Sequence, residues 1–234
     1  MPDGNGPSTI VLVHGAWHGG WCWDRVVPLL EEQGLDVVRV ELPSVGADPD
    51  SGADLAGDAA AVRAAVDGVE GNVVVCGHSY GGMAITEGAA HHPRVTRLVY
   101  LCAFMPDAGD SLVAITGGPA PWIQLLDDGM TLPDMTQAHS LFFGDCDAAT
   151  QEWAVSRIRA MAAAPFAGAI ATPAWGDVPA TYVICAQDKA LPPELQRDLF
   201  APRADEVIEL QTSHSPFLSQ PAVVAGLLAD RAGP

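Results

Sequence analysis

Ser79 stands between glycines at the point where an apolar run ends. The stretch NVVVCGHSYGG (72–82) places it in a Gly-x-Ser-x-Gly pattern, where an expected strand meets an expected helix. At such a junction a strained backbone can lift a serine hydroxyl above the sheet, and only small neighbours tolerate the tight approach. The pentapeptide alone also fits an ordinary strand-to-helix turn. It predicts a nucleophile only if the chain also supplies a base, an orienting acid and oxyanion donors.

A histidine is the usual base for a serine nucleophile. Of the seven histidines, His214 is the best candidate, because it lies in a polar loop between the last expected strand and the last expected helix. Parallel strands bring such a loop to the same edge of the sheet as Ser79. His78 directly precedes the serine, and adjacent residues on a sharp turn point in different directions. We therefore expect His78 to pack under the turn.

The orienting acid is expected between the serine and the histidine in the chain. Asp188 fits, since it directly follows the apolar stretch TYVICAQ. An alternative role for Asp188 is to cap the helix expected after it, in LPPELQ. Asp177 and Asp205 each precede an expected strand and would lie at the opposite edge of the sheet.

Oxyanion donors are expected from two backbone amides. The turn His14-Gly15-Ala16-Trp17 follows the first expected strand. A backbone N–H from such a turn, together with the N–H of the residue after the serine, can hold a developing oxyanion. We expect these donors to be Ala16 and Tyr80.

Two other patterns contain residue types that can bind metals. His14 and His18 have an H-x-x-x-H spacing, but they lie in a Gly-rich turn rather than a helix and lack the glutamate of the metalloprotease pattern. The five cysteines are odd in number, widely spaced and without a C-x-x-C pair, which favours buried free thiols over disulfides or zinc. We expect no metal.

The surrounding elements alternate between apolar strands and amphipathic helices, which predicts an α/β fold with a mainly parallel sheet and helices on both faces. Residues 105–178 break this rhythm, with a helical patch at 149–163 and no clear strand. We expect a single structural domain, with residues 1–104 and 179–234 as the core and 105–178 as a cap insertion. The expected strands are 9–14, 35–43, 72–77, 95–104, 180–188 and 205–210, and the expected helices are 23–33, 54–69, 80–92, 193–200 and one that begins near 221.

The composition restricts the partners. Eleven Lys and Arg against 29 Asp and Glu give a formal net charge of −18, which repels phosphate backbones and anionic lipids. We therefore expect neither nucleic acid nor membrane as a partner. With no signal-like N-terminus and no run of about 18 apolar residues, a cytoplasmic protein is expected. No Gly-rich phosphate loop is present, so no cofactor is expected.

Two long stretches resemble a known family. They are VLVHGAWHGGWCWDRVVPLLEEQGLDVVRVELP and VCGHSYGGMAITEGAAHHPRVTRLVYLCAFMPDAG. Both are similar to the α/β-hydrolase superfamily, in the branch of plant hydroxynitrile lyases, plant methylesterases and their bacterial relatives. The resemblance covers most of the chain and implies a triad of Ser79, Asp188 and His214 under a small cap.

Departures from the family pattern narrow the chemistry. The lyases of this branch carry a threonine after the histidine of the first turn and a lysine after the catalytic histidine. Those positions are Gly15 and Ser215 here, and the only lysine is Lys189. The dehalogenases and epoxide hydrolases of the superfamily use an aspartate where this chain has Ser79. We therefore expect a carboxylic ester hydrolase that works through an acyl-enzyme intermediate.

The substrate and the assembly are less constrained. A biosynthetic methylesterase, thioesterase or lactonase, and a hydrolase-like small-molecule receptor, stay open as alternatives. The protein is expected to be a monomer or a homodimer. An apolar pocket for a small ester is expected from aromatic residues of the oxyanion turn and the insertion, most of which could also simply pack the cap on the core. The pocket candidates are Trp17, Trp122, Phe142 and Trp153.

Overall fold

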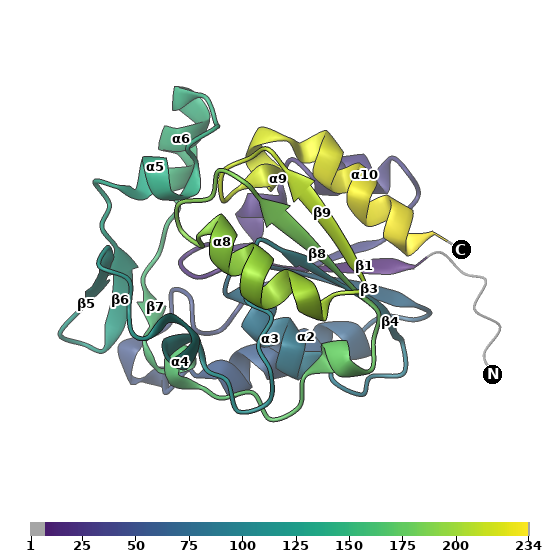
Figure 1. Cartoon of the computed structure of the whole chain (residues 1–234), viewed down its shortest axis with the longest axis horizontal. Helices are drawn as coiled ribbons and strands as arrows, with labels where there is room; N and C mark the ends of the chain where they lie inside the picture. The colour runs from purple at the N-terminus through teal and green to yellow at the C-terminus, as the bar shows by residue number, and fades with distance from the viewer. Residues whose placement is uncertain (1–7, 234) are drawn as a thin grey trace.

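A six-stranded parallel sheet forms the centre of the protein in the computed structural model, which describes residues 8–233 (Figure 1). The strand order is β2-β1-β3-β4-β8-β9, and every neighbouring pair is parallel. Strand β2 pairs on one side of β1, and the later strands β3, β4, β8 and β9 follow one another on the other side. The strands are β1 (Thr9–Val13), β2 (Val37–Val40), β3 (Val73–His78), β4 (Val95–Leu101), β8 (Ala180–Cys185) and β9 (Glu206–Leu210).

Helices cover both faces of this sheet (Figure 1). Helices α2 and α3 pack on one face, while α1 and α10 pack on the other. The expected α/β-hydrolase architecture is therefore confirmed. The helices of the core are α1 (Val27–Glu31), α2 (Leu55–Asp67), α3 (Gly81–Gly88), α8 (Pro193–Leu195), α9 (Pro216–Ser219) and α10 (Pro221–Ala232). Short 3-10 turns lie at Gly20–Trp23, Pro49–Ser51, Ala174–Gly176 and Ala201–Arg203, and a π-helical segment, η4, at Gln196–Phe200.

The first helix is shorter than the sequence predicted. Instead of one helix over 23–33, a 3-10 turn ends at Trp23 and α1 begins at Val27. Pro28 explains the break, because it has no N–H to donate to the carbonyl of Asp24 and so cannot continue a helix from that turn. Proline is tolerated in the first turn of a helix, which is where α1 places it.

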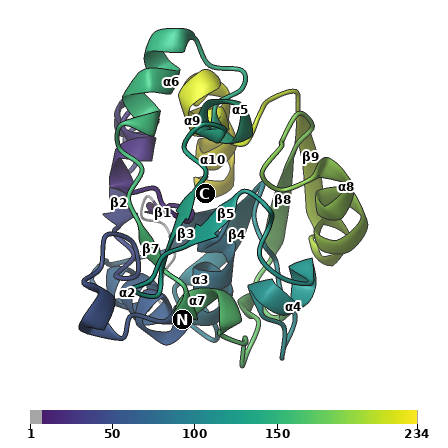
Figure 2. The same cartoon turned by 90° about the vertical axis from the view of Figure 1, so that its left-hand side faces the viewer.

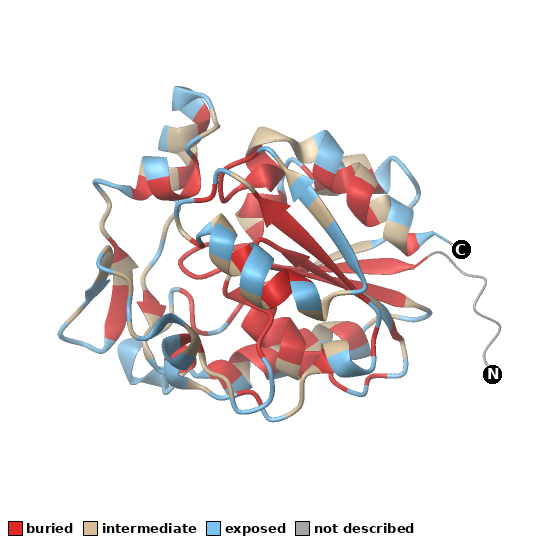
Figure 3. Cartoon of the chain, in the orientation of Figure 1, coloured by how far each residue is buried: buried red, intermediate tan, exposed pale blue. Residues whose placement is uncertain are grey.

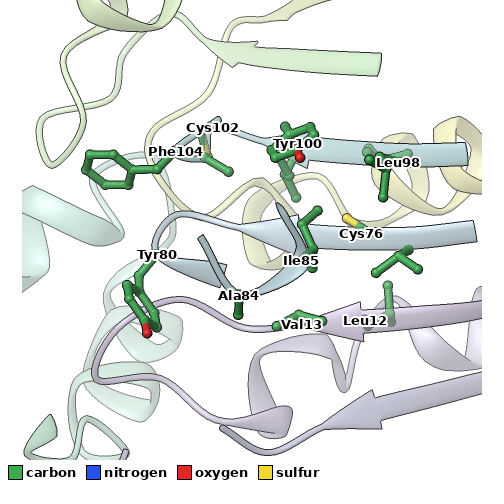
Figure 4. Packing of buried hydrophobic residues seen from close by; sticks show 14 of the residues in the cluster. Leu12, Val13, Cys76, Tyr80, Ala84, Ile85, Leu98, Tyr100, Cys102 and Phe104 are labelled. Atoms are coloured by element: carbon green, nitrogen blue, oxygen red, sulfur yellow. The ribbon is translucent and has the colours of Figure 1, made fainter. Parts of the chain in front are cut away.

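The core lies where the sheet is covered on both sides (Figure 3). All residues of β1, β3 and β8 are buried, whereas the edge strand β9 is partly exposed. Leu12 and Cys76 are register partners on β1 and β3, Leu98 lies on the next strand, β4, and none of the three has exposed surface (Figure 4). All five cysteines are free, and Cys146 alone among them is partly exposed. Among residues 8–233, no helix combines the length and apolar character needed to cross a membrane.

Residues 105–178 form their own small elements at the end of the sheet where β8 ends (Figures 1 and 2). The expectation of no strand here was wrong, since β5, β6 and β7 make an antiparallel sheet. Strands of two to four residues are too short to show alternation in a sequence. The elements are α4 (Leu112–Thr116), β5 (Ile123–Leu125), β6 (Met130–Pro133), α5 (Ala138–Phe142), α6 (Ala148–Val155), β7 (Met161–Ala162) and α7 (Ala164–Ala167). The helix expected over 149–163 thus ends at residue 155.

The stretch 159–162 ties this segment to the core. The Arg159 N–H donates to the Trp17 carbonyl at 3.0 Å, and the Ala162 N–H donates to the Ser44 carbonyl at 2.9 Å. Met161 forms an isolated β-bridge with Val45 between them. The backbone hydrogen bonds of residues 111–126, by contrast, stay within residues 111–134 in the described chain.

Candidate active site

Ser79 occupies a strained turn between β3 and α3. Its φ is +53°, a left-handed conformation that few residues other than glycine adopt. The turn is held by the Ser79 carbonyl, which accepts hydrogen bonds from the Gly82 N–H at 3.0 Å and the Phe104 N–H at 3.1 Å. The side chain is partly exposed at the carboxyl end of β3.

The glycines around the serine are required by close backbone approaches. A Cβ atom on Gly77 would lie 2.8 Å from the Gly81 carbonyl oxygen, and one on Gly81 would lie 2.6 Å from the His14 oxygen. On Gly82 it would lie only 2.0 Å from the Phe104 oxygen. The sharp turn and the packing of α3 against the sheet therefore depend on residues without side chains, as the sequence pattern predicted.

His214 and Asp188 are brought together at the ends of β8 and β9. His214 Nδ1 lies 2.6 Å from Asp188 Oδ2, and the two residues are 2% and 4% exposed. Asp188 Oδ1 accepts the Ala190 and Leu191 N–H groups at 2.8 and 2.9 Å. Asp188 therefore closes a turn and does not cap α8, whose N-cap is Pro192 with no side-chain hydrogen bond, and its other carboxylate oxygen stays directed at His214.

The serine hydroxyl is not hydrogen-bonded to this pair. Among the described residues, no hydrogen bond links Ser79 Oγ with His214 or any other group. With Nδ1 directed at Asp188, the Nε2 atom of His214 is the ring atom left to accept a proton. Serine–histidine hydrogen bonds are often long without substrate and tighten during the reaction.

Gln196 is a buried partner that the sequence analysis missed. Its Nε2 donates to Asp188 Oδ2 at 3.0 Å and to the Leu191 carbonyl at 2.7 Å. Its Oε1 accepts the Cys185 N–H at 3.0 Å. The side chain therefore holds the same carboxylate oxygen that contacts His214. Nothing in the sequence distinguishes this glutamine from a surface residue on an amphipathic helix.

His78 supports His214 from beneath. Its Nε2 donates to the His214 carbonyl oxygen at 2.8 Å, and the two rings lie 4.6 Å apart between centroids. Burial lowers the pKa of His78 well below its usual value, so the ring is neutral and holds the backbone of His214 rather than acting as an acid. This matches the expectation that His78 packs under the turn.

One group of possible metal ligands occurs among residues 8–233. Donor atoms of His78, Cys102 and His214 lie within 4.8 Å of one another. The Cys102 thiol already donates to the His214 carbonyl oxygen at 3.4 Å, and burial raises its pKa well above the usual value, whereas metal ions bind the thiolate. His14 Nε2 is occupied as well, since it accepts the Leu42 N–H at 3.1 Å.

The turn after β1 lies beside the serine. Ala16 and Tyr80 both line the same cavity as Ser79, and neither backbone N–H has a hydrogen-bond partner in the described chain. His18 fixes the turn, with its Nδ1 at 2.8 Å from the Ala16 carbonyl oxygen. Burial lowers the pKa of His18 to about 3, so its ring is neutral and Nδ1 donates. Two free amides therefore lie beside the serine.

A cavity of about 540 Å³ opens above Ser79. Its volume is in the range typical of small-molecule sites. Its lining comes from three parts of the chain: the turns that carry Ala16 and Ser79 together with Phe104, residues 112 and 115–123 together with Phe166, and residues 189–192 together with Leu195. Most of the lining side chains are apolar: Trp17, Phe104, Leu112, Ile115, Trp122, Ile123, Phe166, Leu191 and Leu195.

Two of the four aromatic pocket candidates do not line this cavity. Trp17 and Trp122 do, and their rings pack edge to face at 5.6 Å. Phe142 lies behind them, with its ring 6.1 Å from Trp17 and 5.8 Å from His214. Trp153 packs on Trp21 at 5.3 Å. These two rings pack residues 105–178 against aromatic residues of the N-terminal part of the chain, and sequence composition does not distinguish this role from pocket lining.

A serine lifted from a strand-to-helix turn at the carboxyl edge of a parallel sheet is characteristic of α/β hydrolases. A family model described as "Alpha/beta hydrolase family" matches residues 10–227. The chain belongs to this family, and the resemblance inferred from its sequence is confirmed.

Named relatives and a solved structure align over almost the whole chain. A pyrethroid hydrolase of Sphingobium wenxiniae is 30% identical, over 95% of this chain and 87% of the relative. Polyneuridine aldehyde esterase of Rauvolfia serpentina is also 30% identical, over 94% of each chain. A crystal structure of a pyrethroid hydrolase superimposes with a TM-score of 0.82 at 28% identity, over 96% of this chain and 97% of that one. The expectation of an ester hydrolase agrees with these relatives.

Proposed function

We propose that the protein hydrolyses carboxylic esters of small, largely apolar substrates through an acyl-enzyme intermediate. The observation that carries the proposal is the placement of Ser79. It stands on a strained turn at the floor of an apolar cavity of about 540 Å³, at the edge of the sheet that also holds the hydrogen-bonded pair of His214 and Asp188. The names of the relatives, a pyrethroid hydrolase and an aldehyde esterase, support ester chemistry.

In the first step, His214 Nε2 takes the proton of the Ser79 hydroxyl as its oxygen attacks the ester carbonyl carbon. Asp188 holds the Nδ1–H of His214 and stabilises the ring once it carries two protons. Proton transfer of this kind contributes roughly 10²- to 10⁴-fold to the rate. The protonated ring then gives its proton to the leaving alcohol, and the acyl group stays on Ser79.

The oxyanion of the tetrahedral intermediate is held by the N–H groups of Ala16 and Tyr80. Neither amide has another partner in the described residues, so donating to the oxyanion breaks no existing hydrogen bond. A donor of this kind is typically worth about 3 to 4 kcal/mol. Water activated by His214 then releases the acid and restores the serine.

We further propose that residues 105–178 act as a cap on the core. Support comes from the cavity wall, because Leu112, Trp122 and Phe166 all belong to this segment and face the same cavity as Ser79. A wall built from the cap selects substrates by shape and apolar area. A methylester of a natural product stays a second candidate substrate, since a plant esterase is among the relatives.

Hydrolysis of p-nitrophenyl esters from acetate to hexanoate tests this function. We expect the wild type to cleave them and Ser79→Ala to lose activity by about 10⁴-fold or more. Ser156→Ala is the matched control, because Ser156 is exposed on the end of α6, outside the cavity lining. Circular dichroism and thermal unfolding verify that both variants fold. Equal rates for Ser79→Ala and wild type would reject Ser79 as the nucleophile, and no turnover by a folded wild type would reject the esterase for simple esters.

A further inference from the structure

Lys189 contributes the one charged side chain among the described residues that line the cavity. It is also the only lysine of the chain. The residue is exposed, and no described residue forms a hydrogen bond or ion pair with its ammonium group. The carboxylate next to it in sequence, Asp188, is occupied by His214 and by two backbone amides. The ammonium is therefore free to meet a ligand.

The position of Lys189 is fixed by its neighbours. The Asp188 carboxylate accepts the Ala190 and Leu191 N–H groups, which closes a tight turn around Lys189. The backbone of the turn is thus held by the same carboxylate that holds His214. Such a turn keeps the backbone of Lys189 at one position beside the cavity.

We infer that Lys189 selects esters that carry a carboxylate at the end remote from the ester group, such as half-esters of dicarboxylic acids. This inference rests on the proposed ester hydrolysis at Ser79. An apolar cavity wall disfavours a buried carboxylate. The acid group of a bound half-ester therefore stays at the mouth of the cavity, the part open to solvent, while its ester group reaches Ser79. Lys189 is exposed at the cavity wall and meets it with a charge-assisted hydrogen bond.

The net charge of −18 opposes this preference only at long range. Charges separated by more than about 10 Å are largely screened at an ionic strength of about 0.1 M. A contact between ammonium and carboxylate is screened much less when one side of it is apolar protein. The local attraction therefore outweighs the general repulsion of anions once the substrate has entered the mouth.

The test compares a half-ester with a neutral ester of similar length. The substrates are mono-p-nitrophenyl glutarate and p-nitrophenyl pentanoate, and the quantity is the ratio of their kcat/KM values. We expect Lys189→Met to lower the glutarate-to-pentanoate ratio about tenfold, which corresponds to about 1.4 kcal/mol, and Lys189→Arg to keep most of it. Arg157→Met is the control for net charge, since Arg157 is exposed and stacks on Trp153 outside the cavity lining.

An unchanged ratio in Lys189→Met, or an equal fall in Arg157→Met, would overturn the inference. A failure of the proposed function is recognised separately, because the wild type would then cleave neither ester. Binding decides the role of Lys189 in that case. Calorimetry with monomethyl glutarate should give a Kd about tenfold weaker for Ser79→Ala/Lys189→Met than for Ser79→Ala, and equal Kd values would refute the inference without any turnover.

Discussion

Asp58 is the buried carboxylate that holds the residue after the serine. It lies on α2 with no exposed surface and accepts the Tyr80 hydroxyl at 2.7 Å. It also accepts the Ser44 N–H at 3.0 Å and the Ser44 hydroxyl at 2.6 Å. Burial raises the pKa of Tyr80, so its hydroxyl stays protonated and donates. Asp58 thus joins α2, the loop after β2 and the residue that follows Ser79.

Replacing Asp58 with alanine leaves three buried donors without an acceptor. An unsatisfied buried donor costs about 1 to 3 kcal/mol. The two hydroxyls of Tyr80 and Ser44 can rotate toward other acceptors, and the buried charge is relieved, so we take the low end for each. The expected loss for Asp58→Ala is then about 3 kcal/mol of unfolding free energy, measured by urea denaturation at pH 7. Asp58→Asn keeps one acceptor oxygen and should lose less.

The activity should also fall, even at a temperature where the less stable Asp58→Ala variant is still folded. If Tyr80 moves, its N–H no longer points at the oxyanion, so kcat for a p-nitrophenyl ester should decrease in folded Asp58→Ala. Tyr80→Phe removes one of the three donors and should rescue part of the stability in the double variant. A loss below about 1 kcal/mol in Asp58→Ala, with no rescue by Tyr80→Phe, would refute the role given to these hydrogen bonds.

Three further changes have definite expected outcomes. Gly82→Ala places a Cβ 2.0 Å from the Phe104 oxygen and should destabilise the fold by about 3 kcal/mol or more. Gly226 on α10 has open space around it, so Gly226→Ala should stabilise the fold slightly. Thermal unfolding of both variants measures the difference. Burial lowers the pKa of His18 to about 3, so the unfolded chain binds a proton that the folded chain refuses. Stability should therefore fall by up to about 1.4 kcal/mol per unit as the pH drops below about 6, and urea titrations should show a shallower fall in His18→Gln. Gln196→Leu removes a hydrogen bond to Asp188 and should lower kcat about tenfold with KM nearly unchanged; steady-state kinetics with a p-nitrophenyl ester would contradict this if only KM moved.

Much of the candidate site was predictable because its parts follow strands. Ser79, Asp188 and His214 each come after an apolar run, and parallel strands deliver their ends to one edge of a sheet. The glycines around the serine are required by close approaches of the local backbone, and a local requirement of this kind is visible in the sequence. The fold class follows from the same alternation of strands and helices.

The remaining features depend on packing between distant segments, which no local pattern encodes. Gln196 and Asp58 look like ordinary polar residues of amphipathic helices, and only the folded chain shows them buried against the site. Phe142 and Trp153 are aromatic residues of the type that often lines a pocket, yet they pack residues 105–178 against the rest of the chain. The strands β5 to β7 were missed because their pairing, rather than their sequence, defines them.

The backbone hydrogen bonds of residues 159–162 fix one side of residues 105–178, the proposed cap, to the core. The N–H groups of Arg159 and Ala162 donate to the carbonyls of Trp17 and Ser44, whereas the backbone hydrogen bonds of residues 111–126 stay within residues 111–134 in the described chain. A segment that is held on one side moves most easily on the side that is not held. We therefore expect substrate and product to pass between α4 and α8. Substitutions in residues 112–123 should change the rate of substrate entry without breaking the hydrogen bonds of residues 159–162.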